Sequence, residues 1–432
     1  MKTYNFKDGS QIDIKKMLAD RAPTGYESYE VTVAQIIKEV KEKGDEAVAM
    51  FTQKFDGVNL DIQSLKVTTQ EVKDAYSQVD PEFIEVLKRA KIRIEAFHLK
   101  QKTNSWFDTC EKGTILGQKV TPIGCVGVYV PGGKAVYPSS VLMNLLPAKV
   151  AGVKKIILTT PPSKALGGKI SPLILVAADL CGVTEIYKVG GAQAIAAMAF
   201  GTESIPKVDK IVGPGNIYVA LAKKAVYGHV SIDSIAGPSE VMVIADESAN
   251  PKFIAADLLS QAEHDELACA ILVTTDTKVA SEVESELIRQ TAYLSRKEII
   301  EASLTKYGTI ILVNTLDEAI EICNDVAPEH LEICTKEPFQ VMPKITNAGA
   351  IFLGNYSPEP LGDYMAGPNH VLPTNATAKF FSPLSVDDFV KKSSIISFNE
   401  TALLDLKEDL VLFAEAESLT AHANAIKVRF EK

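Results

Sequence analysis

The sequence predicts an α/β protein with two parallel sheets, because short β-rich runs alternate with apolar, helix-like segments over most of its length. One series of runs lies between about residues 120 and 236, and a second series begins at 239–246. A chain of 432 residues is also too long for one compact core, which supports more than one domain. Parallel strands need crossover helices between them, so both domains are expected to be Rossmann-like.

The N-terminal part differs from this pattern. Residues 1–22 are interpreted as a polar arm, whereas apolar residues recur every three or four positions over 27–105, as they do in helices. Pro81 suits the first turn of the second of these helices. The β-rich runs of the first series that follow are 126–130, 154–160, 185–190 and 210–213.

Four parts of the chain are expected from these patterns. They are an N-terminal arm at 1–22, a first Rossmann-like α/β domain formed by 23–125 together with 237–382, a second Rossmann-like domain at 126–236, and a small helical tail domain at 383–432. The first domain carries the polar motifs, and the second carries the glycine-rich loops.

Composition excludes several classes of partner. A net charge of −10 and a pI near 5.3 argue against binding to nucleic acid or to an anionic membrane. The sequence has no apolar run that resembles a membrane span or a signal peptide, so we expect a cytoplasmic protein. Its six cysteines form no CxxC pair, which favours reduced thiols.

Three glycine-rich loops follow predicted strands of the first series: VPGGKA (130–135), VGGAQA (189–194) and VGPGNIY (212–218). Such loops lie at the carboxyl ends of parallel strands, where glycine lets the backbone approach a phosphate. The GxGxxG fingerprint is absent, because its last glycine would be Tyr218, and a Walker loop fails at Val128 and Ala135. The loops therefore predict a dinucleotide site without naming the nucleotide, and simple turns are the alternative.

Four of the six histidines lie in polar clusters of the C-terminal half, at 261–265, 327–332, 361–374 and 415–422. Histidine is the commonest metal ligand, and its protonation changes near neutral pH. Each cluster also contains a carboxylate or an amide. This pattern predicts a metal-assisted site assembled from distant segments, whereas His98 and His229 are expected to have no role.

The candidate metal ligands are Gln261, His264, Asp363 and His422. We expect Gln261 and His264 to share a helix face, although an exposed pair is the alternative. Asp363 is expected in a long loop, where an aspartate is more often a turn cap. His422 follows Glu417 on a tail helix. A nitrogen and oxygen set without sulfur suits zinc or another borderline divalent ion.

Glu329 and His330 follow Pro328 at the start of a predicted strand. A histidine with a neighbouring carboxylate suits general acid–base catalysis. An exposed loop pair is the alternative interpretation.

The motifs together resemble the histidinol dehydrogenase family over nearly the whole chain. VGVYVPGGKAVYPSSVLMN, VGGAQAIAAMAFGT, KIVGPGNIYVA, IAGPSEV, SQAEHD, APEHLE, GDYMAGPNHVLPT and EAESLTAH occur in the family's order and at similar separations. The resemblance implies oxidation of L-histidinol to L-histidine through a bound aldehyde, with two NAD reduced. It also implies a homodimer in which the C-terminal tail completes the neighbouring subunit's site.

The resemblance also implies a role for each matching residue. Glu329 and His330 match the acid–base pair. Tyr129, Gln193 and Asn216 match NAD contacts. The implied zinc ligands are Gln261, His264, Asp363 and His422. The implied substrate contacts are Ser239, Gln261, His264, His330, Asp363, Glu417 and His422.

Three other functions compete with this interpretation. One is an aldehyde dehydrogenase with a cysteine nucleophile, for which Cys125 is the best candidate. Another is a zinc hydrolase with Glu329 as the base, in which the glycine loops only turn the chain. The third, a metal-stabilised binding module, would leave Glu329 and His330 without a task.

Overall fold

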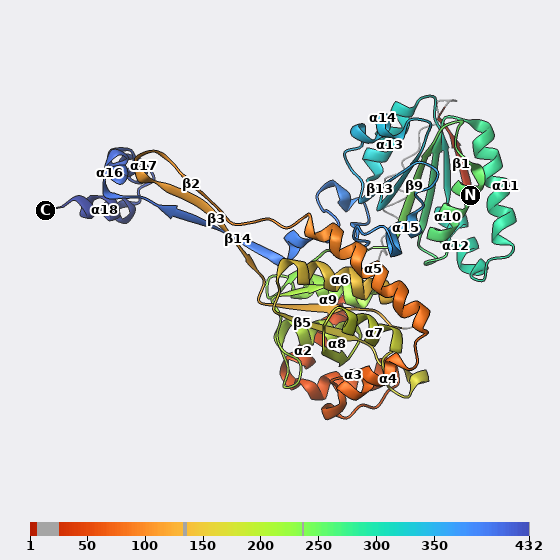
Figure 1. The fold of residues 1–432 in the computed structure, drawn as a ribbon, viewed down its shortest axis with the longest axis horizontal. Helices are drawn as coiled ribbons and strands as arrows, with labels where there is room; N and C mark the ends of the chain where they lie inside the picture. The colour runs from red at the N-terminus through yellow and green to blue at the C-terminus, as the bar shows by residue number, and fades with distance from the viewer. Residues whose placement is uncertain (7–25, 133–135, 236, 432) are drawn as a thin grey trace. The chain divides into compact units, whose positions relative to one another are not determined.

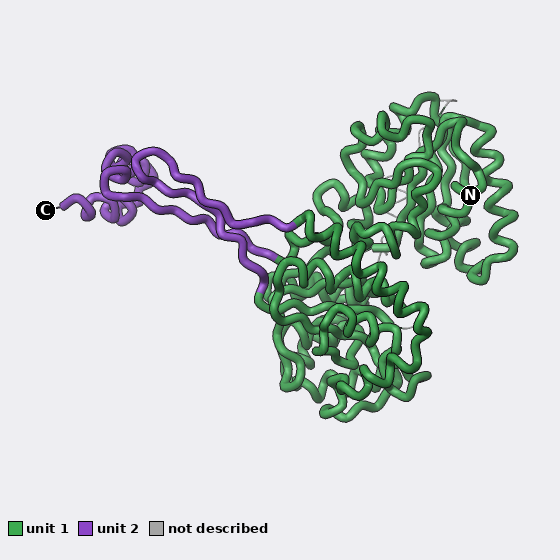
Figure 2. Tube along the Cα trace, in the orientation of Figure 1, with its two compact units in different colours: residues 1–101, 124–389 green, residues 102–123, 390–432 purple. Residues whose placement is uncertain are grey.

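The computed structural model describes residues 1–6, 26–132, 136–235 and 237–431. The chain divides into two compact units (Figure 2). Unit 1 contains residues 1–101 and 124–389, and unit 2 contains residues 102–123 and 390–432. Unit 1 holds two parallel sheets, which we call sheet A and sheet B, and this confirms the predicted α/β class.

Sheet A has the strand order β1-β11-β10-β9-β12-β13, and every pair in it is parallel. The strands are β1 (Lys2–Asn5), β9 (Glu240–Ala245), β10 (Cys269–Thr274), β11 (Thr309–Leu312), β12 (His330–Cys334) and β13 (Ala350–Leu353). Residues 2–5 of the expected polar arm thus form an edge strand, while 7–22 lie outside the described residues.

Helices cover both faces of sheet A (Figure 1). One face packs on α10 (Pro251–Ala262), α11 (Thr277–Thr291) and α12 (Lys297–Tyr307), and the other on α13 (Leu316–Val326) and α14 (Pro338–Val341). Along β9, Val241 and Val243 point to the first face, and Met242 and Ile244 to the second. This alternation explains why the strand is apolar throughout, as strands buried on both faces are.

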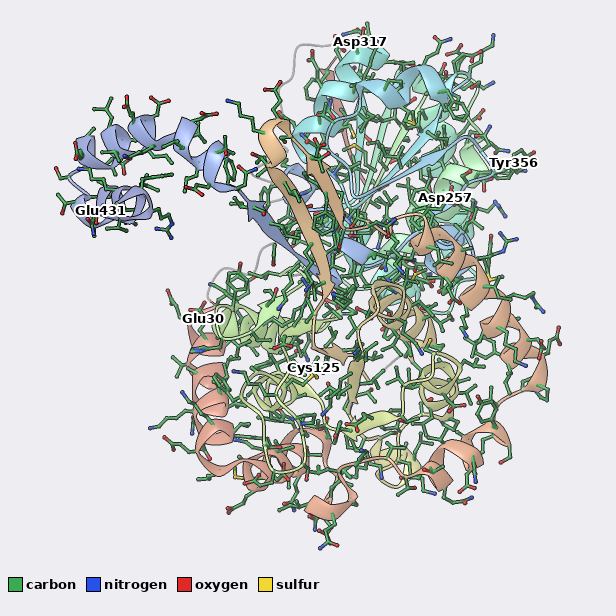
Figure 3. The ribbon with its side chains drawn as sticks, turned by 60° about the vertical axis from the view of Figure 1, so that its left-hand side comes forward. Glu30, Cys125, Asp257, Asp317, Tyr356 and Glu431 are labelled. Atoms are coloured by element: carbon green, nitrogen blue, oxygen red, sulfur yellow. The ribbon has the colours of Figure 1, made fainter. Side chains whose placement is uncertain are left out.

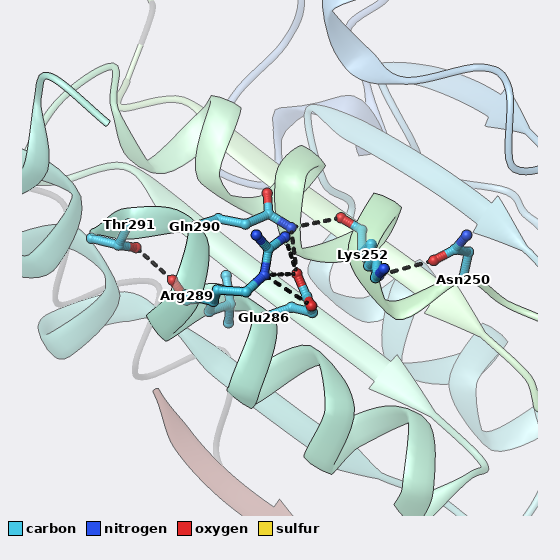
Figure 4. A network of polar contacts seen from close by, with 7 residues as sticks. Asn250, Lys252, Glu286, Arg289, Gln290 and Thr291 are labelled. Carbon is cyan, nitrogen blue, oxygen red and sulfur yellow. Dashed lines mark hydrogen bonds and ion pairs between the residues drawn. The ribbon is translucent and has the colours of Figure 1, made fainter. Parts of the chain in front are cut away.

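A polar network joins α11 to the start of α10 (Figure 4). Gln290 donates a hydrogen bond from Nε2 to the Lys252 carbonyl at 3.0 Å and a second one to Glu286. Arg289 forms an ion pair with the same Glu286 carboxylate. Asn250 caps α10 by accepting from the Lys252 backbone N–H. The network therefore holds the helix that carries Gln261 against its neighbour.

Sheet B is also fully parallel, with the order β6-β5-β4-β7-β8. Its strands are β4 (Cys125–Tyr129), β5 (Lys155–Thr160), β6 (Glu185–Lys188), β7 (Lys210–Val212) and β8 (Ser231–Ile232). Its crossover helices are α6 (Pro138–Ala151), α7 (Pro172–Leu180), α8 (Gly191–Phe200) and α9 (Ile217–Val226). The strand order reverses direction between β4 and β7, and such a switch point is where open α/β sheets bind ligands.

The N-terminal helices pack on the sheet B side of unit 1. They are α2 (Glu27–Lys43), α3 (Asp45–Asp56), α4 (Thr69–Tyr76) and α5 (Pro81–Leu99). Val33, Ile36 and Val40 on α2 share a core with Tyr129 and Ile157 of sheet B, and α5 contacts α6. The structure therefore differs from the expected grouping of 23–125 with 237–382. An apolar stripe shows that a helix packs, but not which sheet it packs against.

Short segments complete unit 1. They are α15 (Glu359–Tyr364) and the single-turn helices η2 (Ile62–Ser64), η4 (Lys164–Leu166), η5 (Met342–Lys344), η6 (Thr377–Lys379) and η7 (Val386–Phe389). Buried Asn369 joins three segments here. Its Nδ2 donates to the Met143 carbonyl at 2.7 Å and lies 3.3 Å from His98 Nε2, and its Oδ1 accepts from the Val371 N–H at 2.9 Å.

Unit 2 contains an antiparallel sheet and three helices. The sheet has the order β14 (Val390–Ser397), β3 (Ile115–Pro122), β2 (Trp106–Thr109), and the single-turn helix η3 (Glu111–Gly113) lies between β2 and β3. The helices are α16 (Glu400–Asp405), α17 (Lys407–Ala416) and α18 (Thr420–Lys427), with η8 (Val428–Phe430) after them. We expected a helical tail from 383; the structure instead pairs the tail's strand with a hairpin from 102–123.

Unit 2 has almost no core of its own. Its buried apolar side chains are Ala402 and Ala423, both small. Many of its large apolar side chains are exposed: Trp106, Phe107, Leu116, Ile396, Phe398, Leu404, Leu406, Leu410, Leu412, Phe413, Leu419 and Val428. Apolar exposure of this extent in one small unit indicates an interaction surface.

Replacing Asn369 with Ala should lower the free energy of unfolding by about 2–4 kcal/mol, because three hydrogen bonds are lost and buried partners stay unsatisfied. A urea titration followed by circular dichroism measures the loss. Exposed Asn314, whose hydrogen bonds within the described ranges are to Glu318, is the control: its Ala variant should stay within about 0.5 kcal/mol of wild type. Equal losses in the two variants would contradict the role given to Asn369.

Candidate active site

Unit 1 contains a cavity of about 1000 Å³ lined by residues from both sheets and their loops. The glycine loops contribute Pro131, Gly132 and the segment 213–216. The polar clusters contribute Ser239, Gln261, His264, Glu329, His330, Glu359, Asp363 and His370. The cavity thus brings together segments that lie far apart in the sequence, from Pro131 to Thr374.

Glu329 and His330 are held by one backbone residue of the neighbouring strand. Helix α13 ends at Val326 and is followed by the capping residue Ala327, which is left-handed with φ 51°, and β12 begins at His330. The Glu240 N–H donates to Glu329 Oε2 at 2.8 Å, and His330 Nδ1 lies 3.0 Å from the Glu240 carbonyl. Because a carbonyl only accepts, Nδ1 carries the hydrogen and Nε2 is left as a proton acceptor.

Burial sets the protonation of this pair. Both side chains are buried, so the alternative of an exposed loop pair is wrong. Burial lowers the pKa of His330 to about 4, although the nearby charge of Asp363 opposes the shift. Burial also raises the pKa of Glu329 well above its ordinary value, and the charges of Asp363 and Glu359 add to this. The imidazole is therefore uncharged and able to act as a base at neutral pH.

Three side chains form a cluster suited to a divalent ion. One ligand atom each of His264, Glu359 and Asp363 lies within 4.8 Å of the others. Gln261 lines the same cavity, and its Oε1 is buried without a hydrogen-bond partner among the described residues. A buried orphan oxygen beside an imidazole and two carboxylates fits the nitrogen and oxygen chemistry of zinc.

The local structure around these ligands differs from the expected one. Helix α10 ends at Ala262, so Gln261 is helical but His264 lies in the following turn. Asp363 was expected in a loop and instead lies on α15, one turn after Glu359. The i, i+4 spacing puts both carboxylates on one helix face. Sequence reasoning missed Glu359, although its spacing from Asp363 would have indicated it had the helix been recognised.

Hydrogen bonds position the carboxylates of α15. His370 Nδ1 lies 3.4 Å from Asp363 Oδ1, and its Nε2 lies 3.3 Å from Ser140 Oγ on α6. Burial alone would raise the pKa of Asp363, but the hydrogen bond with His370 and the nearby histidines lower it. Burial and the charge of Asp363 raise the pKa of Glu359 to about 8. His330 Nε2 lies 3.7 Å from Glu359 Oε1.

Two of the three residues matched to NAD contacts, Tyr129 and Asn216, lie at the ends of the switch-point strands β4 and β7, whereas Gln193 lies on α8 after the edge strand β6. Tyr129 ends β4, and its hydroxyl accepts from the Gly191 N–H at 3.2 Å. Asn216 caps α9 through Oδ1 and lines the cavity. Gln193 is 1% exposed, and both its amide atoms lack a hydrogen-bond partner within the described ranges. Tyr129 and Gln193 are not among the residues that line the cavity, and the Gln193 amide has a donor and an acceptor that no described residue satisfies.

The remaining candidate residues are Ser239, Glu417, His422 and Cys125, and one of them lines the cavity. Ser239 lines the cavity, next to β9. Glu417 and His422 belong to unit 2, where both are exposed on or beside α17 and α18, and their roles remain predictions. Cys125 is the first residue of β4, at the strand end opposite Tyr129 (Figure 3). It does not line the cavity, and burial raises the pKa of its thiol, which disfavours a nucleophile.

Comparison with known proteins agrees with these features. A profile described as histidinol dehydrogenase matches residues 19–430. A histidinol dehydrogenase of Clostridium acetobutylicum is 60% identical over 427 residues, with 98% of each chain covered. One from Bacillus anthracis is 57% identical over 415 residues, covering 96% of each. The crystal structure of the Elizabethkingia anophelis histidinol dehydrogenase superposes with a TM-score of 0.94 at 40% identity, covering 99% of this chain and 98% of that one.

Divalent-metal binding should release protons and strengthen as pH rises. The pKa of Glu359 is about 8, so its carboxyl is protonated at pH 7, and an ion bound beside it must displace that proton. We expect the affinity for Zn²⁺ to increase by up to about 10-fold per pH unit between pH 6 and 8. Calorimetry in two buffers of different ionisation enthalpy counts the protons.

The matched control is Glu359→Gln, which has no proton to release at this position. Its zinc affinity should depend less on pH than that of wild type over the same range. If the two proteins release the same number of protons, Glu359 is not the group linked to metal binding.

Proposed function

We propose a function on the premise that this chain belongs to the histidinol dehydrogenase family. The family makes it an oxidoreductase that acts on histidinol. The proposed reaction is the zinc-dependent oxidation of L-histidinol to L-histidine through bound L-histidinaldehyde, with two NAD reduced, in the last steps of histidine biosynthesis in the cytoplasm. The observation that carries this proposal is one cavity in which an uncharged imidazole, a buried carboxyl and a metal-type donor cluster face the glycine loops.

Zinc would be held by Gln261, His264 and Asp363, completed by His422 of a second subunit. Tyr129, Gln193 and Asn216 would contact NAD. When bound, zinc supplies a Lewis acid that anchors substrate nitrogen atoms, and NAD accepts the two electrons of each oxidation. Glu359 lies within the same donor cluster, so it is either a further ligand or a substrate contact.

The protein's own groups carry the proton transfers. In the first oxidation, His330 Nε2 accepts the proton that the substrate hydroxyl loses. In the second, Glu329 accepts, in its ionised form, a proton from the water that attacks the aldehyde carbon. His330 releases the first proton to solvent and then accepts the proton of the resulting hydrate. Both groups line the cavity, and the Glu240 bonds keep them in one orientation.

Water attack makes a covalent cysteine intermediate unnecessary. None of the six cysteines forms a disulfide within the described residues, and four of them are buried. A cysteine-dependent aldehyde dehydrogenase is therefore a weaker candidate than the family activity.

Unit 2 is proposed to complete the site of a second copy in a homodimer, with Glu417 and His422 as its contributions. The exposed apolar side chains of unit 2 support this, because Ala402 and Ala423 are the only apolar side chains buried in its described residues, and a second chain could cover the others. No described helix is long and apolar enough to cross a membrane.

The direct test is an assay of purified protein with L-histidinol, NAD and Zn²⁺, in which NADH is followed by its near-ultraviolet absorbance. NADH and histidine in a two-to-one ratio are expected. Chelation should abolish turnover and leave the circular dichroism spectrum unchanged, since the metal donors are not needed by the two sheet cores. Full activity of metal-free protein would overturn the zinc assignment.

Replacing Glu329 with Gln should slow oxidation of the aldehyde more than oxidation of the alcohol, because only the second half-reaction needs an activated water. Replacing His330 with Asn should slow both. Losses of roughly 10²–10⁴-fold are the scale for a general acid–base group. Rates measured separately from histidinol and histidinal provide the test, and equal losses in both halves for the Glu329 variant would contradict its role.

Mixing two inactive variants should restore activity if the tail acts in the neighbouring subunit. One subunit carries His422→Ala and the other carries His264→Ala. In a mixed dimer one site receives both defects and the other receives none. Activity should therefore return in differentially tagged, purified mixed dimers. Confirmed mixed dimers that stay inactive would place His422 in its own subunit's site.

A further inference from the structure

A buried ion pair lies under the glycine loop that follows β7. Lys223 on α9 pairs through Nζ with Asp233, and the two side chains are only 3% and 5% exposed. Both residues also line the cavity. The Asp233 N–H bonds to the Ile211 carbonyl at 3.2 Å, which fixes this aspartate beside β7.

Both charges bind the same backbone residue. Lys223 Nζ donates to the Gly213 carbonyl at 3.0 Å, and Asp233 Oδ2 accepts from the Gly213 N–H at 2.8 Å. The N–H and the carbonyl of Gly213 are thus each tied to one member of the pair. A loop residue held on both sides cannot rotate without breaking a charge-assisted hydrogen bond.

Gly213 lies so close to β4 that no side chain fits there. Its φ is +120°, and a Cβ built on it would lie 2.0 Å from the Tyr129 carbonyl oxygen. Gly213 also begins the segment that leads to Asn216, the cap of α9. The position of Gly213 therefore sets where the 213–216 loop crosses the switch point of sheet B.

The chemistry of the Lys223–Asp233 pair suits a role in positioning the loop rather than in stabilising the fold. Removing two charges from water is costly, and apolar residues of similar volume often stabilise a protein as well as a buried ion pair does. An apolar pair, however, could not bond the Gly213 N–H and carbonyl. The pair also borders the cavity, where an exact loop position matters for binding.

We propose that Lys223 and Asp233 are positioning residues for the dinucleotide: they hold Gly213 so that the 213–216 loop presents its backbone and Asn216 to the bound NAD. This inference rests on the proposed function, which supplies the dinucleotide. The pair acts through the loop and takes no part in the proton transfers.

Lys223→Met tests the proposal in the full-length, zinc-loaded protein. We expect the Kd for NAD, measured by calorimetry, to rise by about 10–100-fold, the scale of a small misplacement of a binding group. The KM for NAD should rise with it, by more than the KM for histidinol. The affinity for Zn²⁺ should not change, because the proposed metal donors come from α10 and the turn after it, from α15 and from α18, and none of them lies on α9 or in the 213–216 loop.

Lys188→Met is the matched control. Lys188 is also a buried lysine of the sheet B side, 8% exposed, and its Nζ pairs with Glu71 at 2.7 Å, but it does not line the cavity. Its loss should lower Tm and leave the Kd for NAD within about 2-fold of wild type, since a structural pair affects stability alone. If Lys188→Met weakens NAD binding as much as Lys223→Met does, the effect is general destabilisation and the proposal is wrong.

The double variant Lys223→Met, Asp233→Leu separates stability from positioning. It removes both charges, so it should regain much of the Tm lost in Lys223→Met, but NAD should still bind weakly because Gly213 has no partners. Recovery of NAD affinity in the double variant would overturn the proposal. If Lys223→Met does not fold, the double variant and Asp233→Asn give the same comparison.

Failure of this inference can be told apart from failure of the proposed function. A wild-type protein that oxidises histidinol with NAD, while Lys223→Met binds NAD as tightly as wild type, refutes the positioning role only. A wild-type protein that neither binds NAD nor forms NADH refutes both.

Discussion

The site depends on the parallel pairing of β9 with β12, and within it on the backbone of Glu240. One N–H and one carbonyl of this residue hold the two side chains that carry the proton chemistry, Glu329 and His330. The bond to Nδ1 selects the tautomer in which Nε2 faces the cavity as a base. The Glu240 carboxylate in turn accepts from the Asn375 N–H, which ties a distant loop to the same point. The register of β9 with β12 therefore fixes the tautomer of the His330 imidazole.

Burial is the second constraint, and it changes the pKa values of several carboxyl groups in unit 1. Glu329, Glu332 and Glu359 are all buried, and burial raises the pKa of each above its ordinary value. Each buried carboxyl group needs a nearby cation, a bound proton or a hydrogen bond, because it has lost its contact with water. At Asp363, the His370 imidazole supplies one such partner. The remaining carboxylate charge explains why the cluster of His264, Glu359 and Asp363 suits a divalent cation.

The two sheets border the cavity with opposite ends of their strands. Sheet B follows the general rule for open α/β folds, because its loops lie beyond the carboxyl ends of β4 and β7. Sheet A departs from it, because Glu329 and His330 stand at the amino end of β12, next to the first residue of β9. A ligand that spans the cavity would therefore meet backbone N–H groups at one end and buried side chains at the other.

The sequence by itself determined where the strands and glycine loops lie, and it placed Glu329 and His330 at a strand start, since these features depend on neighbours along the chain. The motifs were also specific enough to identify the family. Tertiary structure alone decided that α2 to α5 pack on the sheet B side of unit 1, because an amphipathic stripe does not specify its partner. It also decided the role of Glu359: the six-residue helix α15, with a proline and a glycine, has weak intrinsic propensity. That helix is held by contacts from far along the chain, a bond from the Glu359 N–H to Glu332 and one from Ser260 to the Glu359 carboxylate. Long-range contacts of this kind leave no periodic signal in the sequence.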